Sequence, residues 1–168
     1  AISLWKNTGL NAAQAEAQAK DDSERITARI MARYEERLSA YQSVDFDDLI
    51  GLPLKLLAEF PEVRAKWQAA LGHVLVDEYQ DTNASQYEVL KHLVGERGRF
   101  TAVGDDDQSI YGWRGAEVDN ILRFEKDFPG AQVIRLEQNY RSTGHILAAA
   151  SGIIAKNAGR LGKTLWTA

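Results

Sequence analysis

The sequence predicts an α/β fold in which helices flank a parallel sheet and a helical segment precedes it. Residues 74–76 are three consecutive aliphatic side chains, which is typical of a strand buried on both faces. A helical pattern with capping-box form runs from Ser85 to Gly95, and Phe100–Val103 is a second short apolar run. A strand, helix and strand within about 30 residues form a crossover unit, whose strands are parallel.

Helices are also expected before this unit. The first 22 residues predict irregular structure or a weak helix, whereas apolar side chains recur at helical spacing from Ser23, the candidate N-cap, to Tyr41. A row of arginines on another face of that helix indicates a solvated surface rather than a DNA track. Asp45 should cap a second helix that Pro53 breaks or kinks, and a third helix should occupy 61–71.

Beyond the crossover unit, the pattern predicts a helix over 118–128, a third strand over 132–136 and a helix over 144–157. At 168 residues the chain is long enough for one ordinary domain with its own core. Both ends nevertheless look cut from something larger, because the chain opens abruptly and has no evident closing element.

Charge is distributed unevenly along the chain. The net charge of −4 gives no support for nucleic-acid binding, although it does not exclude a few local contacts. Residues 1–44 are neutral overall, residues 45–130 carry −8 and residues 131–168 carry +4, which suggests parts of different domains. The composition is that of a globular protein, cysteine is absent, and no apolar run approaches the roughly 20 residues that span a bilayer. A cytoplasmic location is therefore expected.

Two adjacent acids, Asp77 and Glu78, follow the first predicted strand directly. Ligands of parallel sheets gather at the carboxyl ends of the strands, and the second strand ends nearby at Gly104-Asp105. Two acids at such an edge suggest separate roles, in which one binds a metal ion and the other acts on a water molecule. The alternative is a strand that simply ends in polar residues.

The loop after the second strand carries further candidates. Gln108 can orient a water or sense a phosphate. If the chain is extended there, the rings of Tyr111 and Trp113 share one face about 6.6 Å apart, where they could stack on unpaired bases beside Arg114. Burial of both rings in the core is the alternative, but flanking glycines favour an exposed loop. The acids 105–107 could bind a metal ion, although a solvated loop is expected because consecutive side chains diverge.

A third polar run follows the predicted strand over 132–136. Tyr140 offers a flat ring for a nucleobase and Arg141 could complete a phosphate site, although each is equally compatible with a structural role. Gly162-Lys163-Thr164 imitates the end of a phosphate-binding loop. It follows a helix rather than a strand, however, and Asn157 stands where that motif needs its first glycine, so we reject it.

Taken together, residues 76–83, 103–116 and 136–142 resemble motifs II, III and IV of the UvrD/Rep/PcrA superfamily 1 DNA helicases, in the same order. Residues 44–50 and 159–167 also resemble this family, and the latter lean towards UvrD rather than Rep. The resemblance implies a partial P-loop NTPase (RecA-like) sheet. It also implies a motor with ATP and Mg²⁺ as cofactors that moves 3′ to 5′ on single-stranded DNA and opens duplex junctions.

The resemblance also implies a role for each candidate. Asp77 would hold Mg²⁺, Glu78 would activate the attacking water, and Gln108 would sense the γ-phosphate. Arg141 would act as an arginine finger and Tyr140 would stack on adenine. The DNA contacts would come from the following residues: Tyr111, Trp113 and Arg114.

The chain departs from the family pattern in what it lacks. No glycine-rich loop ending in Gly-Lys-Thr precedes the motif II strand, and motifs V and VI are missing after Trp166. We therefore expect 1–44 to be part of a 1B-like subdomain, 45–130 the second half of the RecA-like 1A domain, and 131–168 the start of 2A. On this view the isolated chain does not hydrolyse ATP, and the parent is cytoplasmic and nucleoid-associated, with unknown protein partners.

Two other functional classes stay open at this point. The first is a non-catalytic DNA-binding or scaffolding module that retains a helicase fold. The second is a nuclease that uses carboxylate-bound metal ions at Asp77, Glu78 and 105–107, although these acids lack obvious spacing for a two-metal site.

Overall fold

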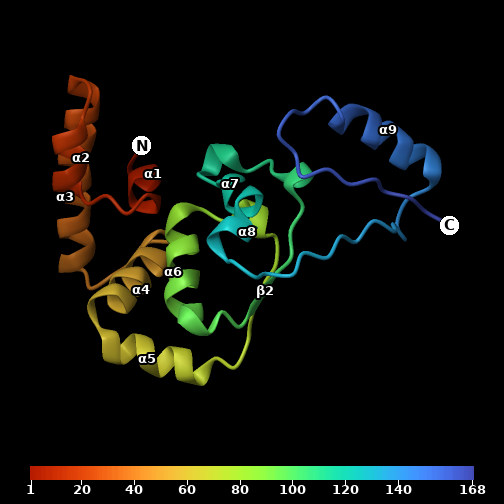
Figure 1. Ribbon diagram of the computed structural model, residues 1–168. Helices are drawn as coiled ribbons and strands as arrows, with labels where there is room; N and C mark the ends of the chain where they lie inside the picture. Colours follow the sequence, from red (N-terminus) through yellow and green to blue (C-terminus); the bar gives the residue numbers. More distant parts are fainter.

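The computed structural model describes residues 1–168 and confirms a mixed arrangement of helices around a small parallel sheet (Figure 1). The helices α1–α3 lie on one side of the sheet and α9 lies on the other. None of the helices combines the length and apolar character needed to cross a bilayer. The elements are α1 (Ile2–Asn7), α2 (Ala12–Gln18), α3 (Asp22–Ala40), α4 (Asp48–Glu59), α5 (Pro61–Ala70), β1 (Val74–Val76), α6 (Ala84–Val94), β2 (Phe100–Ala102), α7 (Asp119–Leu122), α8 (Phe124–Asp127) and α9 (Gly144–Ile154).

The N-terminal segment is more helical than the sequence predicted, because α1 and α2 form within the first 22 residues. Asn11 and Gln14 make a reciprocal capping box on α2. Asp21, rather than Ser23, caps α3 by accepting the amide of Glu24 at 2.8 Å. The arginines of α3 lie at the surface, as the sequence predicted for a solvated face, and three of them pair with acids: Arg25, Arg29 and Arg33.

Of the break or kink predicted at Pro53, the break is wrong, because α4 runs through this residue from Asp48 to Glu59. Proline removes one amide, but α4 packs against both α5 and α6, and this packing outweighs the local cost. The N-cap residue of α4 is Asp47 rather than the predicted Asp45, and it makes no side-chain cap bond. Asp45 lies two residues earlier, where its Oδ1 accepts the amide of Asp48 at 2.8 Å. The helix α6 is capped by Asn83, two residues before Ser85, where the sequence pattern placed the cap.

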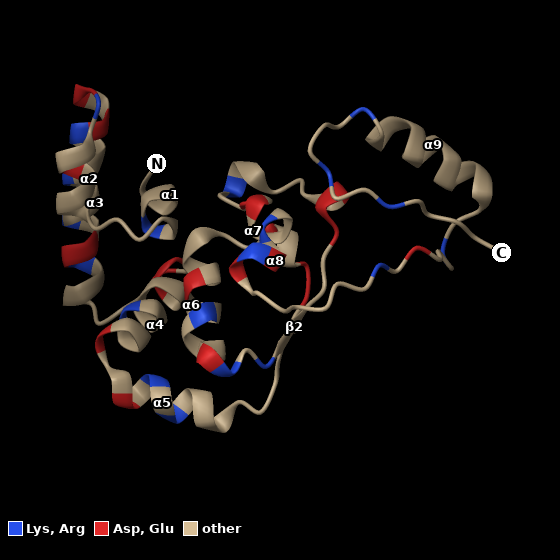
Figure 2. Cartoon of the chain, viewed as in Figure 1, with Lys and Arg blue, Asp and Glu red and all other residues tan.

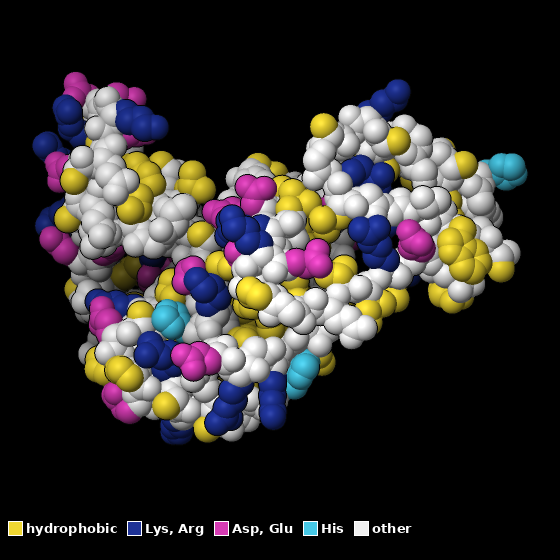
Figure 3. Space-filling view, viewed as in Figure 1, with side chains coloured by type: hydrophobic (Ala, Val, Ile, Leu, Met, Phe, Trp, Pro, Cys, Tyr) yellow, Lys and Arg dark blue, Asp and Glu magenta, His cyan; other side chains and the backbone are white.

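The crossover unit is confirmed: β1 and β2 are parallel neighbours, with Val76 opposite Ala102, and α6 connects them. Only one face of this sheet is covered, by side chains of α6, α7 and α8. The predicted burial of β1 on both faces is therefore wrong, since Leu75 is 78% exposed. Other large apolar side chains are also exposed on the surface of the molecule (Figure 3).

The expected single core is replaced by two small clusters, and only 13 of the 168 residues are buried. One cluster lies between α2 and α3, around Met31. The other surrounds Tyr79 beneath the sheet, where the ring of Phe124 meets it edge-on at 5.5 Å. The first cluster therefore stabilises the N-terminal helices, and the second stabilises the sheet with the helices that cover it.

The C-terminal third differs most from expectation. The helix predicted over 118–128 is divided into α7 and α8. No strand forms over 132–136, because no backbone lies beside it to complete a ladder; the nearest pairing is an isolated bridge between Gln138 and Trp166. The helix α9 forms within the predicted range.

Candidate functional site

The carboxyl ends of β1 and β2 meet at one edge of the sheet, as the sequence predicted. The pairing continues past both strands, because the amide of Val103 donates to the carbonyl of Val76 at 2.8 Å and the amide of Tyr79 donates to that of Val103 at 3.0 Å. These bonds fix the backbone that carries Asp77 and Glu78 against the backbone that leads to Asp105.

The two acids are exposed and differently oriented. Oδ1 of Asp77 accepts the amide of Glu78 at 2.9 Å, while its Oδ2 accepts no hydrogen bond. Glu78 adopts a left-handed backbone conformation with φ of +49°, which costs a non-glycine residue about 1–2 kcal/mol. Such strain is found at functional sites, where surrounding bonds hold it in place.

Gln80, which the sequence analysis did not single out, is the residue that joins the two strand ends. Its side chain is 1% exposed, donates to Oε2 of Glu78 at 2.8 Å and accepts the amide of Asp105 at 2.9 Å. Gly104 leaves room for it, because a Cβ there would lie 2.8 Å from Oε1 of Gln80. The only signal in the sequence was its position two residues after the acids.

The acidic side chains of the loop 105–107 are half-buried against the C-terminal segment, so the expected solvated loop is wrong. Arg160 binds Asp107 through two nitrogens, Lys163 pairs with Asp105, and the amide of Leu161 donates to Asp106 at 2.8 Å. Figure 2 shows basic residues of the C-terminal segment beside this acidic loop. The loop is therefore held by residues more than 50 positions away in the chain.

Asp105 is the centre of this loop. Burial alone would raise the pKa of its carboxyl group, but the ion pair with Lys163 and the hydrogen bond from Gln108 outweigh burial and lower it. Nε2 of Gln108 donates to Oδ2 of Asp105 at 2.7 Å, so Gln108 joins the strand-end acids indirectly, through Asp105 and Gln80.

The candidate DNA-binding side chains lie on an exposed loop, and not in the core. Trp113 is 75% exposed and Tyr111 is 39% exposed. The chain is not extended between them, because Gly112–Arg114 is a tight 3-10 turn, so the spacing of about 6.6 Å in an extended chain does not apply. The guanidinium of Arg114 lies over both rings, 4.7 Å from the centroid of Trp113 and 5.3 Å from that of Tyr111. This turn presents an aromatic and cationic surface.

Tyr140 and Arg141 are not brought to the strand-end acids by any hydrogen bond or ion pair. Tyr140 is 83% exposed and its hydroxyl donates to Gln138 at 2.7 Å. The amide of Arg141 donates to Asn139, while its exposed guanidinium makes no ion pair. Both side chains are available to a ligand, but this structure does not align them with Glu78.

The side chains at the strand edge fit a magnesium ion in one respect. Mg²⁺ takes one or two carboxylates and completes its shell with water and phosphate oxygens, and the open Oδ2 of Asp77 meets that need. No group of three or more acidic or histidine side chains is arranged to hold a metal ion by itself.

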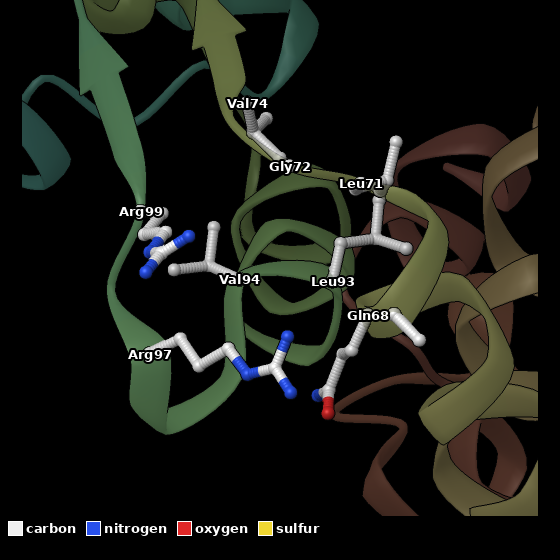
Figure 4. Close-up of a pocket in the computed structure, with 9 residues that line it drawn as sticks. Gln68, Leu71, Gly72, Val74, Leu93, Val94, Arg97 and Arg99 are labelled. Atoms are coloured by element: carbon white, nitrogen blue, oxygen red, sulfur yellow. The ribbon is translucent and has the colours of Figure 1, made fainter.

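Two cavities lie elsewhere. One of about 150 Å³, between Val74, Arg97 and Arg99, is at the amino ends of the strands (Figure 4). It is smaller than the roughly 300 Å³ at which ligand pockets begin. The other, an apolar groove of about 590 Å³ among α4, α5 and α6, offers almost no polar group for a phosphate. The strand edge therefore remains the candidate site.

Comparison with known proteins agrees with this geometry. Residues 1–129 match the family described as the UvrD/REP helicase N-terminal domain. The chain is 56% identical to the ATP-dependent DNA helicase Rep of Salmonella typhimurium and 54% identical to that of Escherichia coli, over 93% of the chain in both. It is 47% identical to the ATP-dependent DNA helicase UvrD1 of Mycobacterium tuberculosis over 99% of the chain.

The identities to these two Rep proteins exceed the identity to UvrD1. The chain spans 23% of the length of each of these relatives, or about a quarter. The family match covers most of the chain and contains both strand ends, Asp77-Glu78 and Gly104-Asp105. This chain belongs to the UvrD/Rep helicase family.

Proposed function

We propose that this chain forms the central part of a DNA helicase that couples ATP hydrolysis to 3′–5′ movement on single-stranded DNA and to the opening of duplex junctions. The main observation behind this proposal is that hydrogen bonds through Gln80 and Asp105 join Glu78 to Gln108 at the carboxyl edge of the sheet. The printed names of the relatives, ATP-dependent DNA helicases, support it. A cytoplasmic, nucleoid-associated location follows from a DNA substrate.

At the nucleotide, Glu78 is the general base. Its Oε1 accepts no hydrogen bond from the chain and is open to take a proton from the attacking water, while Oε2 is held by Gln80. Asp77 offers Oδ2 to Mg²⁺, which when bound neutralises charge on the phosphates of ATP. Gln108 senses the γ-phosphate from the neighbouring strand end.

The remaining contacts come from exposed loops. Arg141 serves as an arginine finger and Tyr140 stacks on adenine, which requires the loop that carries them to approach the strand edge. The turn that carries Trp113 and Arg114, together with Tyr111, binds single-stranded DNA by stacking and charge.

We further propose that 1–44 belongs to a 1B-like subdomain, 45–130 to the second half of a RecA-like 1A domain, and 131–168 to the start of 2A. The separation of the two apolar clusters supports the first boundary. The end of the family match at residue 129 supports the second.

The test uses a chimera in which this chain replaces the matching region of the Escherichia coli Rep helicase. Because a general base contributes about 10²–10⁴-fold, Glu78→Gln should lower the DNA-stimulated kcat for ATP at least about 100-fold and leave nucleotide affinity unchanged. Glu125→Gln, at an exposed glutamate without a hydrogen-bond partner, is the matched control and should behave as the unmodified chimera.

Retained turnover in Glu78→Gln would refute the assigned base. The isolated chain serves as a second control, because no glycine-rich phosphate-binding loop precedes its β1 strand. We expect no ATP turnover from it with or without single-stranded DNA, and measurable DNA-stimulated ATPase activity would contradict the proposal that it needs the rest of a helicase.

A further inference from the structure

Gln80 is a buried polar side chain that none of the proposed roles uses. Its Nε2 donates to Glu78 at 2.8 Å and, in a longer bond, to Asp81 at 3.4 Å, while its Oε1 accepts from Asp105 at 2.9 Å. A carboxylate can only accept and a backbone amide can only donate, so the amide group of Gln80 has one allowed orientation here. A flipped amide would set donor against donor and acceptor against acceptor.

Glu78 depends on this contact for its direction. The hydrogen bond from Gln80 is the only one that its carboxylate accepts from the chain, and it has no ion pair. Its side chain is exposed and has several rotatable bonds, so without Gln80 the carboxylate would sample many rotamers. Gln80, in contrast, is 1% exposed and has little freedom to move.

The other end of Gln80 is fixed to the loop that carries Gln108. The amide of Asp105 is held by Gln80, and the carboxylate of the same residue accepts from Gln108 at 2.7 Å. The order of bonded groups is therefore Glu78, Gln80, Asp105 and Gln108. A shift of the loop changes the position of Gln80 and, through it, the direction of the Glu78 carboxylate.

We propose that Gln80 is a positioning residue, which orients the Glu78 carboxylate for its reaction with water and ties that orientation to the Asp105–Gln108 loop. This inference rests on the proposed function, because it assumes that Glu78 is the base. Gln80 does not touch the water or the nucleotide in this scheme.

The substitution Gln80→Glu, made in the Rep chimera, gives the sharpest test. Its size is unchanged and it can still accept from Asp105, but its second oxygen faces the Glu78 carboxylate and, farther away, Oδ2 of Asp81, which adds to the repulsion once the introduced carboxyl group is ionised. Two carboxylates at this distance share a proton at low pH and repel each other once both are ionised. The protonated form can donate to Glu78 as the amide does.

We therefore expect kcat of Gln80→Glu to be near that of the unmodified chimera at the lowest pH at which both are active. It should fall at least about 10-fold as pH rises through the range in which the shared proton is lost. KM for ATP should stay within about threefold, because binding groups are untouched. Gln86→Glu is the matched control, since Gln86 caps α6 at the surface and lies outside this chain of bonds.

A loss of equal size at every pH, or no loss at all, would overturn the inference, because a structural defect does not follow the protonation of the pair. Gln80→Asn is the second variant and keeps the amide but is too short to reach both partners. It should lower kcat at least about 10-fold with KM unchanged, and a kcat like that of the unmodified chimera would also overturn the inference. Glu78→Gln distinguishes the two proposals. If this variant retains turnover, the proposal that Glu78 is the general base is refuted. If it abolishes turnover while both Gln80 variants behave normally, only the positioning role fails.

Discussion

Gly104 lies where the end of β2 meets Gln80, and Gly104→Ala perturbs this packing without changing any charge. The added methyl carbon would lie 2.8 Å from Oε1 of Gln80, 2.9 Å from Cδ1 of Ile121 and 3.2 Å from the amide nitrogen of Tyr79. Overpacking of this kind costs about 1–3 kcal/mol, and loss of the hydrogen bond that Gln80 accepts adds about 1 kcal/mol. We expect the free energy of unfolding to fall by about 2–4 kcal/mol.

Urea denaturation followed by circular dichroism measures this change. Gly51→Ala is a matched control, because Gly51 lies inside α4 and an added methyl group there meets nothing within 4 Å. Helix propensity predicts that Gly51→Ala stabilises the chain by about 1 kcal/mol, so the two substitutions should have opposite signs. If Gly104→Ala changes stability by less than about 0.5 kcal/mol, the range of an ordinary surface substitution, the close packing at this strand end is refuted.

Two further predictions concern charge and stacking. Lys6 lies 2.7 Å from Asp45 and 2.6 Å from Asp48. Burial alone would raise the pKa of Asp45, but the bonds from Lys6 and the amide of Asp48 lower it. A carboxylate with a lowered folded pKa stabilises the fold above its unfolded pKa of about 3.9 and loses this contribution as pH falls. Lys6→Met should therefore reduce the free energy of unfolding by about 2 kcal/mol at pH 7, a value between those of exposed and buried ion pairs. Near pH 3 the reduction should be much smaller. Urea denaturation that shows the same loss at both pH values would count against this prediction. In the Rep chimera, Trp113→Ala should weaken binding to a labelled single-stranded oligonucleotide about 5- to 150-fold, because stacking contributes about 1–3 kcal/mol per base. Fluorescence anisotropy measures this affinity, and an unchanged value would exclude Trp113 from the DNA contact.

The part of the site that could be predicted from the sequence depends on local pattern. Three aliphatic residues, a capped helix and a second apolar run define a crossover unit, and the parallel geometry of such units places the two strand ends at one edge. This geometry follows from local sequence alone, without any distant contact. The predicted position of Asp77-Glu78 beside the segment that begins at Gly104 is confirmed, and so is the exposure of Trp113 that its flanking glycines indicated.

The rest could not be predicted because it depends on contacts between residues far apart in the chain. Gln80 acts across 25 positions on Asp105, and Arg160 acts across 53 positions on Asp107. The continuation of α4 through Pro53 depends on packing against α5 and α6, which overrides the local preference of proline. A continuous apolar run likewise indicates that β1 can be buried on both faces. Whether both faces are buried depends on which elements pack against the strand in the folded chain.

Asp105 is the point at which these distant contacts meet. Its amide is held by Gln80, and its carboxylate is shared between Gln108 and Lys163. If the C-terminal segment moves relative to β2, it must either break its ion pairs with the acidic loop or displace Asp105. Asp105 cannot be displaced without disturbing the bond that Gln80 makes, and hence the direction of Glu78. Residues 131–168 are therefore coupled to the strand-end acids through a short series of hydrogen bonds, although they make no hydrogen bond to Glu78 themselves.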